Sequence, residues 1–304
     1  MKRDLTSFAG WSGERLAAIL TLAAEMKRAG PDGPRPLHGK SAALIFERES
    51  LRTRVSFEVG IAQLGGHPVM LQQETIGMAT RESVHDIGLT LSHYNEFIIA
   101  RTVKHQTIMQ LAESASVPVI NAMTDLVHPC QILADVMTLQ EAGRFSPLVK
   151  LVYLGDGNNI ANSWLELAAK LPLHLVLSCP AGYEPHPLIL EQARSAGVSR
   201  LDMVPDPVAA VREADAVYTD RWPSHREGME EGRRQNVFRP YQVNAALLKH
   251  AKPECLVMHR LPANRGEEIA SEVLDGPRSV VMVQAENRLH VQKAIMAALA
   301  GGQA

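Results

Sequence analysis

Short runs of consecutive apolar residues alternate along the chain with longer stretches in which apolar residues recur every three or four positions. The first pattern predicts buried strands, and the second predicts helices that pack one face on a core. Strands are predicted at residues 42–46, 68–71, 97–100, 117–121, 150–154, 173–179, 200–204, 216–219 and 255–259. Helices are predicted at 12–27, 55–64, 84–94, 107–114, 129–139, 160–171 and 291–299, and loops at 30–36, 72–83 and 220–234.

Strands and helices alternate in two series, one on each side of a domain boundary predicted at residues 143–150. This alternation is typical of mainly parallel sheets, so the predicted fold class is α/β with two doubly wound domains. Such sheets bind ligands at the carboxyl ends of their strands. The residues that directly follow strands are therefore the first candidates for function.

The strand at 42–46 is followed by Ser50, a possible helix cap, and then by Arg52, Thr53 and Arg54. The first turn of a helix attracts anions because its N–H groups are unpaired and carry a partial positive charge. Guanidinium and hydroxyl groups add donors that suit phosphate oxygens. The stretch predicts a site for a phosphate-like dianion; the alternative is an ordinary capped helix with solvated arginines.

Two further strand ends carry candidate residues. Arg101 directly follows the strand at 97–100, and His128 precedes Pro129 at the start of the next helix. Proline is tolerated in a first turn because its missing N–H would have no partner there. Taken alone, Arg101 could be solvated and His128 could be a cap, but their placement together with Ser50 favours one shared site.

A glycine-rich turn, Gly155-Asp156-Gly157-Asn158-Asn159, joins the strand at 150–154 to a helix. It is similar to a dinucleotide-binding turn, but Ile160 stands where the third glycine is required. Nicotinamide binding is therefore disfavoured. The long charged loop at 220–234 is of a length that is usually functional or mobile.

Composition narrows the function classes. Of 304 residues, 46% are hydrophobic and 21% are charged, which fits a soluble globular protein. The net charge of −2 offers no general attraction for nucleic acid or an anionic membrane, so any anion site must be local. The three cysteines form no C-x-x-C pair, and no stretch resembles an export signal or a membrane span. A cytoplasmic protein without a zinc site or a disulfide framework is expected.

The chain carries a series of ordered motifs: S-L-R-T-R at 50–54, R-T at 101–102, H-P-C-Q at 128–131 with L-A-D at 133–135, G-D-G-N-N at 155–159 with N-S at 162–163, Y-T-D at 218–220 with Trp222, H-R-L-P-A at 259–263, and Q-A-E-N-R-L-H at 284–290. In this order they resemble the aspartate/ornithine carbamoyltransferase family, and most closely its ornithine branch. Each motif alone would be weak, but this many in order are very unlikely to arise by chance.

The resemblance implies a carbamoyl-phosphate-binding domain at 1–146, an acceptor-binding domain at 147–285, and a C-terminal helix at 286–304 that packs back on the first domain. It also implies an active site in the interdomain cleft, and a homotrimer or a multiple of trimers. No metal and no cofactor are expected. The partners would be carbamoyl phosphate and an amino-acid or amine acceptor, within amino-acid metabolism and arginine biosynthesis.

The resemblance also implies roles for individual residues. Arg101, His128 and Thr53 would polarise the carbonyl group as catalytic residues, with Arg260 beside the attacking amine. The donor would be bound by Ser50, Leu51, Arg52, Thr53, Arg54, Arg101, His128, Gln131, Arg288 and the backbone carbonyl of Leu261. The acceptor would be bound by Asn159, Asp220, Ser224 and His225.

The sequence departs from the ornithine pattern in two places. It has Ser224-His225-Arg226 where ornithine enzymes read S-M-G, and His259-Arg260-Leu261-Pro262 where they read H-C-L-P. Arg260 brings a permanent positive charge that would disfavour a nearby ammonium. Alternatively, Arg260 could point outward and pair with Asp220 or with the loop acids Glu227, Glu230 and Glu231. A third possibility is that the site accommodates Arg260 and still uses ornithine, at lower efficiency.

The predicted reaction moves the carbamoyl group of carbamoyl phosphate to the side-chain amine of ornithine, giving citrulline and phosphate. One alternative keeps the donor and uses an acylated ornithine, a shorter diamino acid or a polyamine. The other is a catalytically silent paralogue that binds carbamoyl phosphate as a regulatory subunit.

Overall fold

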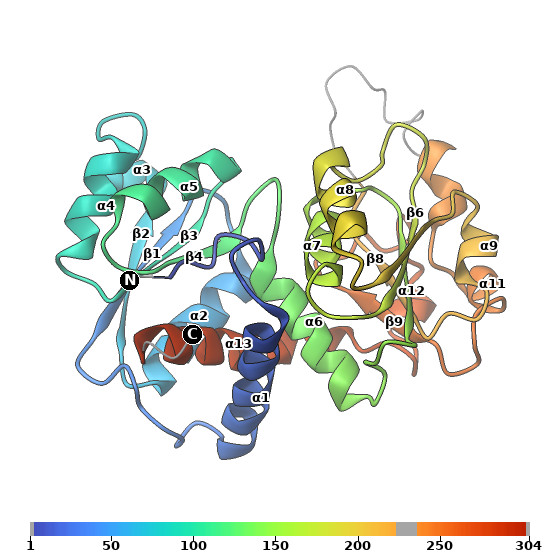
Figure 1. The fold of residues 1–304 in the computed structure, drawn as a ribbon, viewed down its shortest axis with the longest axis horizontal. Coiled ribbons are helices and arrows are strands. Elements are labelled where there is room, and N and C mark those ends of the chain that lie inside the picture. The colour runs from blue at the N-terminus through green and yellow to red at the C-terminus, as the bar shows by residue number, and fades with distance from the viewer. Residues whose placement is uncertain (1–2, 223–235, 302–304) are drawn as a thin grey trace. The chain divides into compact units, whose positions relative to one another are not determined.

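The computed structural model describes residues 3–222 and 236–301, in which strands and helices alternate (Figure 1). The described residues form two compact units. One comprises the residues up to Met137 and those from Glu286 onward, and the other comprises Thr138–Ala285. Within these described ranges, no helix has the length and apolar character needed to cross a bilayer.

The first unit is built on a sheet of four parallel strands in the order β2-β1-β3-β4. Figure 1 shows α4 and α5 on one face of this sheet and α2 and α13 on the other. Since both faces are covered, the two central strands carry continuous buried apolar runs, at 42–46 in β1 and at 97–100 in β3. The elements are α1 (Gly13–Ala29), β1 (Ser41–Phe46), α2 (Leu51–Gln63), β2 (His67–Gln72), α3 (Gln73–Ile76), α4 (Val84–Ser92), β3 (Phe97–Arg101), α5 (His105–Ser114), β4 (Val119–Met123), and the greater parts of α6 (Pro129–Glu141) and α13 (Val281–Ala300).

Helix α13 packs closely on α2 through Gly60. A Cβ atom added at this glycine would lie 3.4 Å from Cγ of Lys293, so a larger side chain would crowd the contact. Lys293 Nζ donates to Gln63 Oε1 at 3.0 Å, and Lys27 Nζ of α1 donates to Asn287 Oδ1 at 2.8 Å. The last helix is therefore fixed on the first unit by packing and by polar contacts.

The second unit contains five parallel strands in the order β7-β6-β5-β8-β9. Figure 1 shows α7 and α8 on one face and α9 and α11 on the other. Val152, Val217 and Val257 of three neighbouring strands pack with Val211 and Leu247 in one apolar cluster. The elements are β5 (Lys150–Leu154), α7 (Asn159–Ala168), β6 (His174–Ser178), α8 (Pro187–Ala196), β7 (Arg200–Met203), α9 (Pro207–Val211), β8 (Ala216–Thr219), η1 (Arg239–Tyr241), α11 (Ala245–Leu248), β9 (Leu256–His259) and α12 (Ser271–Leu274).

The observed architecture confirms the predicted α/β class, and some local predictions are wrong. The stretch 72–83 was expected to be a loop but contains the one-turn helix α3, and α13 begins at Val281 instead of residue 291. The early turns of α13 carry the buried polar residues Gln284, Asn287 and Arg288, which obscure its apolar periodicity. Helices α8, α9, α11 and α12 were not predicted; α9, α11 and α12 have only four or five residues each, too few for a helical periodicity to show.

Candidate active site

The predicted anion site lies at the N-terminus of α2, beside the end of β3. Phe46, the last residue of β1, pairs in register with Arg101, and the N–H of Glu47 donates to the Arg101 carbonyl at 3.0 Å. The strand order places the change of winding direction between β1 and β3, which is where doubly wound sheets bind ligands. Ser50 occupies the N-cap position with an extended backbone, and its side chain makes no capping hydrogen bond.

Three residues from distant parts of the first unit meet in one buried group, the Arg288 cluster, formed by Thr53, Gln131 and Arg288. Arg288 donates from Nη2 to Thr53 Oγ1 and from Nη1 to Gln131 Oε1, both at 2.6 Å. Gln131 in turn donates from Nε2 to Asp135 Oδ1 at 2.9 Å. The cluster residues are at most 3% exposed. A buried guanidinium is costly unless acceptors or an anion share its charge, and Thr53 and Gln131 supply two acceptors. The cluster places the positive charge of Arg288 at this edge of the sheet.

The other predicted donor residues differ in orientation. His128 is buried directly before α6, and its carbonyl accepts from the Gln131 N–H at 3.1 Å, which joins it to the Arg288 cluster through the backbone. Arg52 is half-buried in the first turn of α2. Arg54 is 45% exposed and donates from Nε to Glu58 Oε1 at 3.2 Å, so it lies along the helix surface. Ser50 and Arg54 both line a cavity of about 600 Å³ beside the start of α2.

A second polar group, the Asp220 cluster, lies at the carboxyl edge of the other sheet and comprises Asn158, Asp220 and Arg260. Arg260 Nε lies 2.8 Å from both carboxylate oxygens of Asp220, and Asn158 Nδ2 donates to Oδ2 at 2.9 Å. The Asp220 side chain is 1% exposed and that of Arg260 is 19% exposed. Of the alternatives left open for Arg260, the pairing with Asp220 is observed.

Asn158 was not singled out in the sequence, although its neighbour Asn159 was. Its Oδ1 atom accepts from the Ile160 N–H at 2.9 Å and caps α7, while its amide nitrogen reaches Asp220. Tyr153 also donates to Asn158 Oδ1, at 3.1 Å. Asn159 is buried in the first turn of α7, and its carbonyl accepts from Ser163 Oγ. The sequence feature that could have identified Asn158 is its position, because an asparagine directly before a helix is a favoured N-cap.

The backbone that follows β9 is held by the buried pair His259 and Glu268. The Leu261 N–H donates to His259 Nδ1 at 2.8 Å, so the ring hydrogen is on Nε2, which donates to Glu268 Oε1 at 3.1 Å. The Asn264 N–H donates to the same carboxylate oxygen at 2.7 Å. Leu261 has a φ of 56°, which is uncommon for a residue other than glycine, and this network fixes it.

The remaining motif residues either lie outside the described part of the chain or are buried in the core. Ser224 and His225, predicted to bind the acceptor, and the loop acids Glu227, Glu230 and Glu231 lie outside the described residues. Cys130, inside the H-P-C-Q motif, is fully buried, and burial raises the pKa of its thiol to about 12. A thiol in this state is a poor nucleophile.

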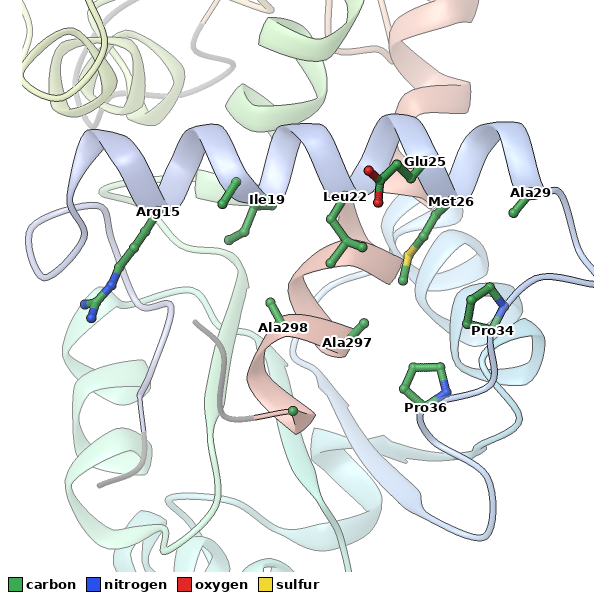
Figure 2. Close-up of a pocket in the computed structure, with 12 residues that line it drawn as sticks. Arg15, Ile19, Leu22, Glu25, Met26, Ala29, Pro34, Pro36, Ala297 and Ala298 are labelled. Carbon is green, nitrogen blue, oxygen red and sulfur yellow. The ribbon is translucent and has the colours of Figure 1, made fainter.

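An apolar cavity of about 540 Å³ lies between α1 and the end of α13 (Figure 2). Ile19, Leu22 and Met26 line it, with Arg15 and Glu25 as its charged residues. Of the predicted site residues that the structure describes, none lines this cavity. Its surface suits apolar groups and not a phosphate, so the candidate site remains at the strand ends.

Comparisons with known proteins identify the family. The family model for the carbamoyl-phosphate-binding domain of aspartate/ornithine carbamoyltransferase matches residues 3–141, and the model for the Asp/Orn-binding domain matches residues 148–299. The chain belongs to the aspartate/ornithine carbamoyltransferase family, and it is therefore a transferase.

Individual relatives and solved structures cover almost the whole chain. It is 46% identical over 303 residues to the ornithine carbamoyltransferase of Chlorobaculum tepidum, covering 98% of this chain and 90% of that protein. It is 48% identical over 298 residues to that of Syntrophus aciditrophicus, covering 97% of this chain and 99% of the relative. The structure of ornithine carbamoyltransferase from Pyrococcus furiosus superposes with a TM-score of 0.94 at 44% identity, covering 99% of this chain and 98% of that one.

Proposed function

We propose that this protein transfers the carbamoyl group of carbamoyl phosphate to the side-chain amine of ornithine, producing citrulline and phosphate. The observation that carries the proposal is the Arg288 cluster, which gathers a cation, a hydroxyl and an amide beside the N-terminus of α2. The names of the relatives at 46% and 48% identity support ornithine as the acceptor.

The phosphate group of the donor would bind at the first turn of α2. The helix N-terminus offers backbone N–H groups and a partial positive charge there. In the proposal, the phosphate oxygens are bound by Ser50, Leu51, Arg52, Thr53 and Arg54. Arg288, which donates to Thr53, adds its positive charge to the site. The Ser50 side chain makes no capping bond to the helix, which supports a role toward a ligand.

The carbonyl oxygen of the donor would be polarised by Thr53, Arg101 and His128. Thr53 accepts a hydrogen bond from Arg288, so its own hydroxyl hydrogen can be directed at the substrate. Donors aimed at the oxygen that becomes negative stabilise the transition state more than the ground state. These three residues are the proposed source of that stabilisation.

The carbamoyl NH2 group would donate to Gln131 Oε1 and to the carbonyl of Leu261. Gln131 Oε1 already accepts from Arg288, and an amide oxygen has a second lone pair. This arrangement fixes the amide orientation, because Gln131 Nε2 is engaged with Asp135. Leu261 is held in its left-handed conformation by His259, which supports a fixed direction for its carbonyl.

The chemical step is nucleophilic substitution at the carbamoyl carbon. The neutral side-chain amine forms a C–N bond to this carbon, and the C–O bond to the phosphate breaks, with its electron pair leaving on the phosphate. The proton lost by the amine is taken up by the departing phosphate. No covalent enzyme intermediate is needed, so positioning and electrostatics supply most of the acceleration.

The acceptor would be recognised by residues of the second unit. Asp220 would pair with an ammonium, and Asn159 would contribute its amide; Ser224 and His225 stay in the proposal as acceptor-binding residues. We assign donor binding to the first unit and acceptor binding to the second. Arg260 directly neighbours Leu261 and is bonded to Asp220, which supports a role beside the attacking amine.

Assembly and location are part of the same proposal. Leu51, Val55 and Val59 recur every four residues along α2 and are 73%, 46% and 39% exposed. Such an apolar stripe supports a contact between subunits, in keeping with the proposed homotrimer.

The free thiols of Cys130, Cys179 and Cys255 are all buried, which supports a reducing location such as the cytoplasm.

A panel of amines tests the proposal. Purified protein is given carbamoyl phosphate with ornithine, a shorter diamino acid, an Nα-acylated ornithine or a diamine, and phosphate release is measured above the enzyme-free rate. We expect ornithine to be the best acceptor. Tight donor binding without turnover on any amine would instead identify a silent, carbamoyl-phosphate-binding paralogue.

A further inference from the structure

The turn at residues 124–127 joins the end of β4 to His128, and it is built around the Thr124 hydroxyl. Thr124 Oγ1 accepts from the N–H groups of Leu126 and Val127, each at 3.3 Å. The same hydroxyl donates to the Val127 carbonyl at 3.3 Å, and the Thr124 N–H donates to this carbonyl at 3.1 Å. Thr124 is 2% exposed, and buried polar groups are costly to leave unpaired. Its side chain therefore shapes the backbone directly before His128.

The buried side chain of Asn121 reaches the same carbonyl. Asn121 Nδ2 donates to the Val127 carbonyl at 3.4 Å and to the Thr6 carbonyl at 2.8 Å. The backbone of Asn121 is itself fixed, because its N–H donates to the Leu5 carbonyl at 2.9 Å and its carbonyl accepts from Cys130 Sγ at 3.4 Å. Two side chains therefore hold the carbonyl that ends the turn.

The other end of the turn adjoins Arg101. Met123, the last residue of β4, pairs in register with Arg101 of β3. The Asp125 N–H donates to the Val103 carbonyl at 3.1 Å, which binds the turn to the chain that leaves β3. The turn thus starts beside Arg101 and ends at His128. Its conformation determines the spacing between these two residues.

Polarisation of a carbonyl group depends on donors at fixed positions. In the proposed function, Arg101 and His128 both donate to the oxygen that becomes negative in the transition state. A displacement of about 1 Å in such a site can slow a reaction by about 100-fold. A change in the turn would therefore slow the chemical step, while the phosphate site at the start of α2 would keep its own donors.

We infer that Thr124, together with Asn121, is a positioning residue for carbamoyl transfer that fixes the spacing between Arg101 and His128. This inference rests on the proposed function. Both side chains act through the backbone of the turn, at the Val127 carbonyl. Loss of either contact should slow the chemical step and leave anion binding at α2 unchanged, which a general loss of structure would not do.

The test compares Thr124→Val, which removes the hydroxyl and keeps the side-chain shape, with Thr124→Ser, which keeps the hydroxyl. Asn121→Ala removes the second side-chain donor to Val127. Ser41→Ala is the matched control, because Ser41 Oγ at the start of β1 in the same unit also donates to a backbone carbonyl, that of Tyr94, at 2.6 Å. The readouts are kcat with carbamoyl phosphate and ornithine, and the Kd of inorganic phosphate measured by calorimetry. Thermal melting verifies that each variant is folded.

We expect kcat of Thr124→Val to fall about tenfold or more, while the Kd of inorganic phosphate stays within about twofold of the wild type. Asn121→Ala should show the same split between kcat and Kd. Thr124→Ser should retain most of the wild-type kcat, and Ser41→Ala should retain all of it.

A wild-type kcat in Thr124→Val overturns the inference and leaves the proposed function intact. A fall in kcat that is matched by an equal weakening of phosphate binding also overturns the inference, because it indicates a general loss of structure. If Thr124→Val does not fold, Asn121→Ala decides by the same two criteria. Absence of carbamoyl transfer by the wild type overturns both the inference and the proposed function.

Discussion

Arg288 and Thr53 are 235 positions apart in the sequence, and the Nη2 atom of Arg288 donates to Thr53 Oγ1 at 2.6 Å. The same guanidinium donates from Nη1 to Gln131. One arginine on the last helix therefore orients a hydroxyl at the start of α2 and an amide in the first turn of α6. All three groups belong to the proposed donor site.

Replacing Arg288 with Gln should impair donor use severely. Loss of the cation removes two charged hydrogen bonds and leaves Thr53 and Gln131 without their common partner. We expect kcat/KM for carbamoyl phosphate to fall about 100-fold or more. Arg15→Gln is the control, because Arg15 is exposed on α1 and lines the apolar cavity. Equal kinetics in Arg288→Gln and the wild type would remove the Arg288 cluster from the donor site.

Asn158 has two separable functions, which two variants should resolve. Asn158→Ala removes both the cap of α7 and the bond to Asp220, so we expect a loss of about 1 kcal/mol in stability and a higher KM for the acceptor. Asn158→Ser retains a capping oxygen but cannot reach Asp220 in the same way. It should restore most of the thermal stability and leave the acceptor KM raised. Recovery of both properties in the serine variant would show that Asn158 acts only as a cap.

The core elements of the fold followed from residue pattern. The strands β5 and β8 were predicted with their observed bounds, because each is a short apolar run that ends at a polar or glycine residue. The start of α13 was missed because Gln284, Asn287 and Arg288 are polar and yet buried, which breaks the apolar periodicity that identifies a helix. Burial of such residues depends on tertiary partners that no local window contains.

Only part of the candidate site could be predicted from the sequence. Strand-end position and residue type indicated Thr53, Arg101 and His128. The choice between partners of Arg260 could not be made, since Asp220 lies 40 positions away and the outcome depends on side-chain geometry. The role of Glu268 was also missed, because a glutamate in a loop gives no sign that it will be fully buried against His259.

Glu268 should stabilise the fold as a hydrogen-bond acceptor, through Oε1, more than through its negative charge. Glu268→Ala leaves His259 Nε2–H and the Asn264 N–H buried without an acceptor, and should lower the free energy of unfolding by about 2–4 kcal/mol. Glu268→Gln keeps an acceptor at Oε1 and should cost about 1 kcal/mol or less. Urea unfolding measures both. Similar losses in the two variants would indicate that the charge itself stabilises this loop.

The buried cysteines predict a dependence of stability on alkaline pH. Burial raises the pKa of Cys130 and of Cys255 from 9.0 to about 12. The folded protein therefore retains protons that the unfolded chain releases, so the free energy of unfolding should fall as the pH rises from 9.0 towards 12. The contribution of the thiols is fully present below pH 9.0.

The same property can be measured chemically. At pH 8 the native protein should react slowly with iodoacetamide at Cys130, Cys179 and Cys255, whereas all three should react readily in urea. Rapid labelling of Cys130 in the native protein would contradict the assignment of a buried, protonated thiol.

We expect this protein to transfer the carbamoyl group of carbamoyl phosphate to ornithine. The most direct measurement supplies carbamoyl phosphate labelled with ¹³C in the carbamoyl group, together with ornithine, and follows both products by mass spectrometry and phosphate analysis. We predict citrulline labelled at its ureido carbon, formed in equal amounts with phosphate above the enzyme-free rate. Phosphate release without labelled citrulline, or no release above that rate, would contradict the claim.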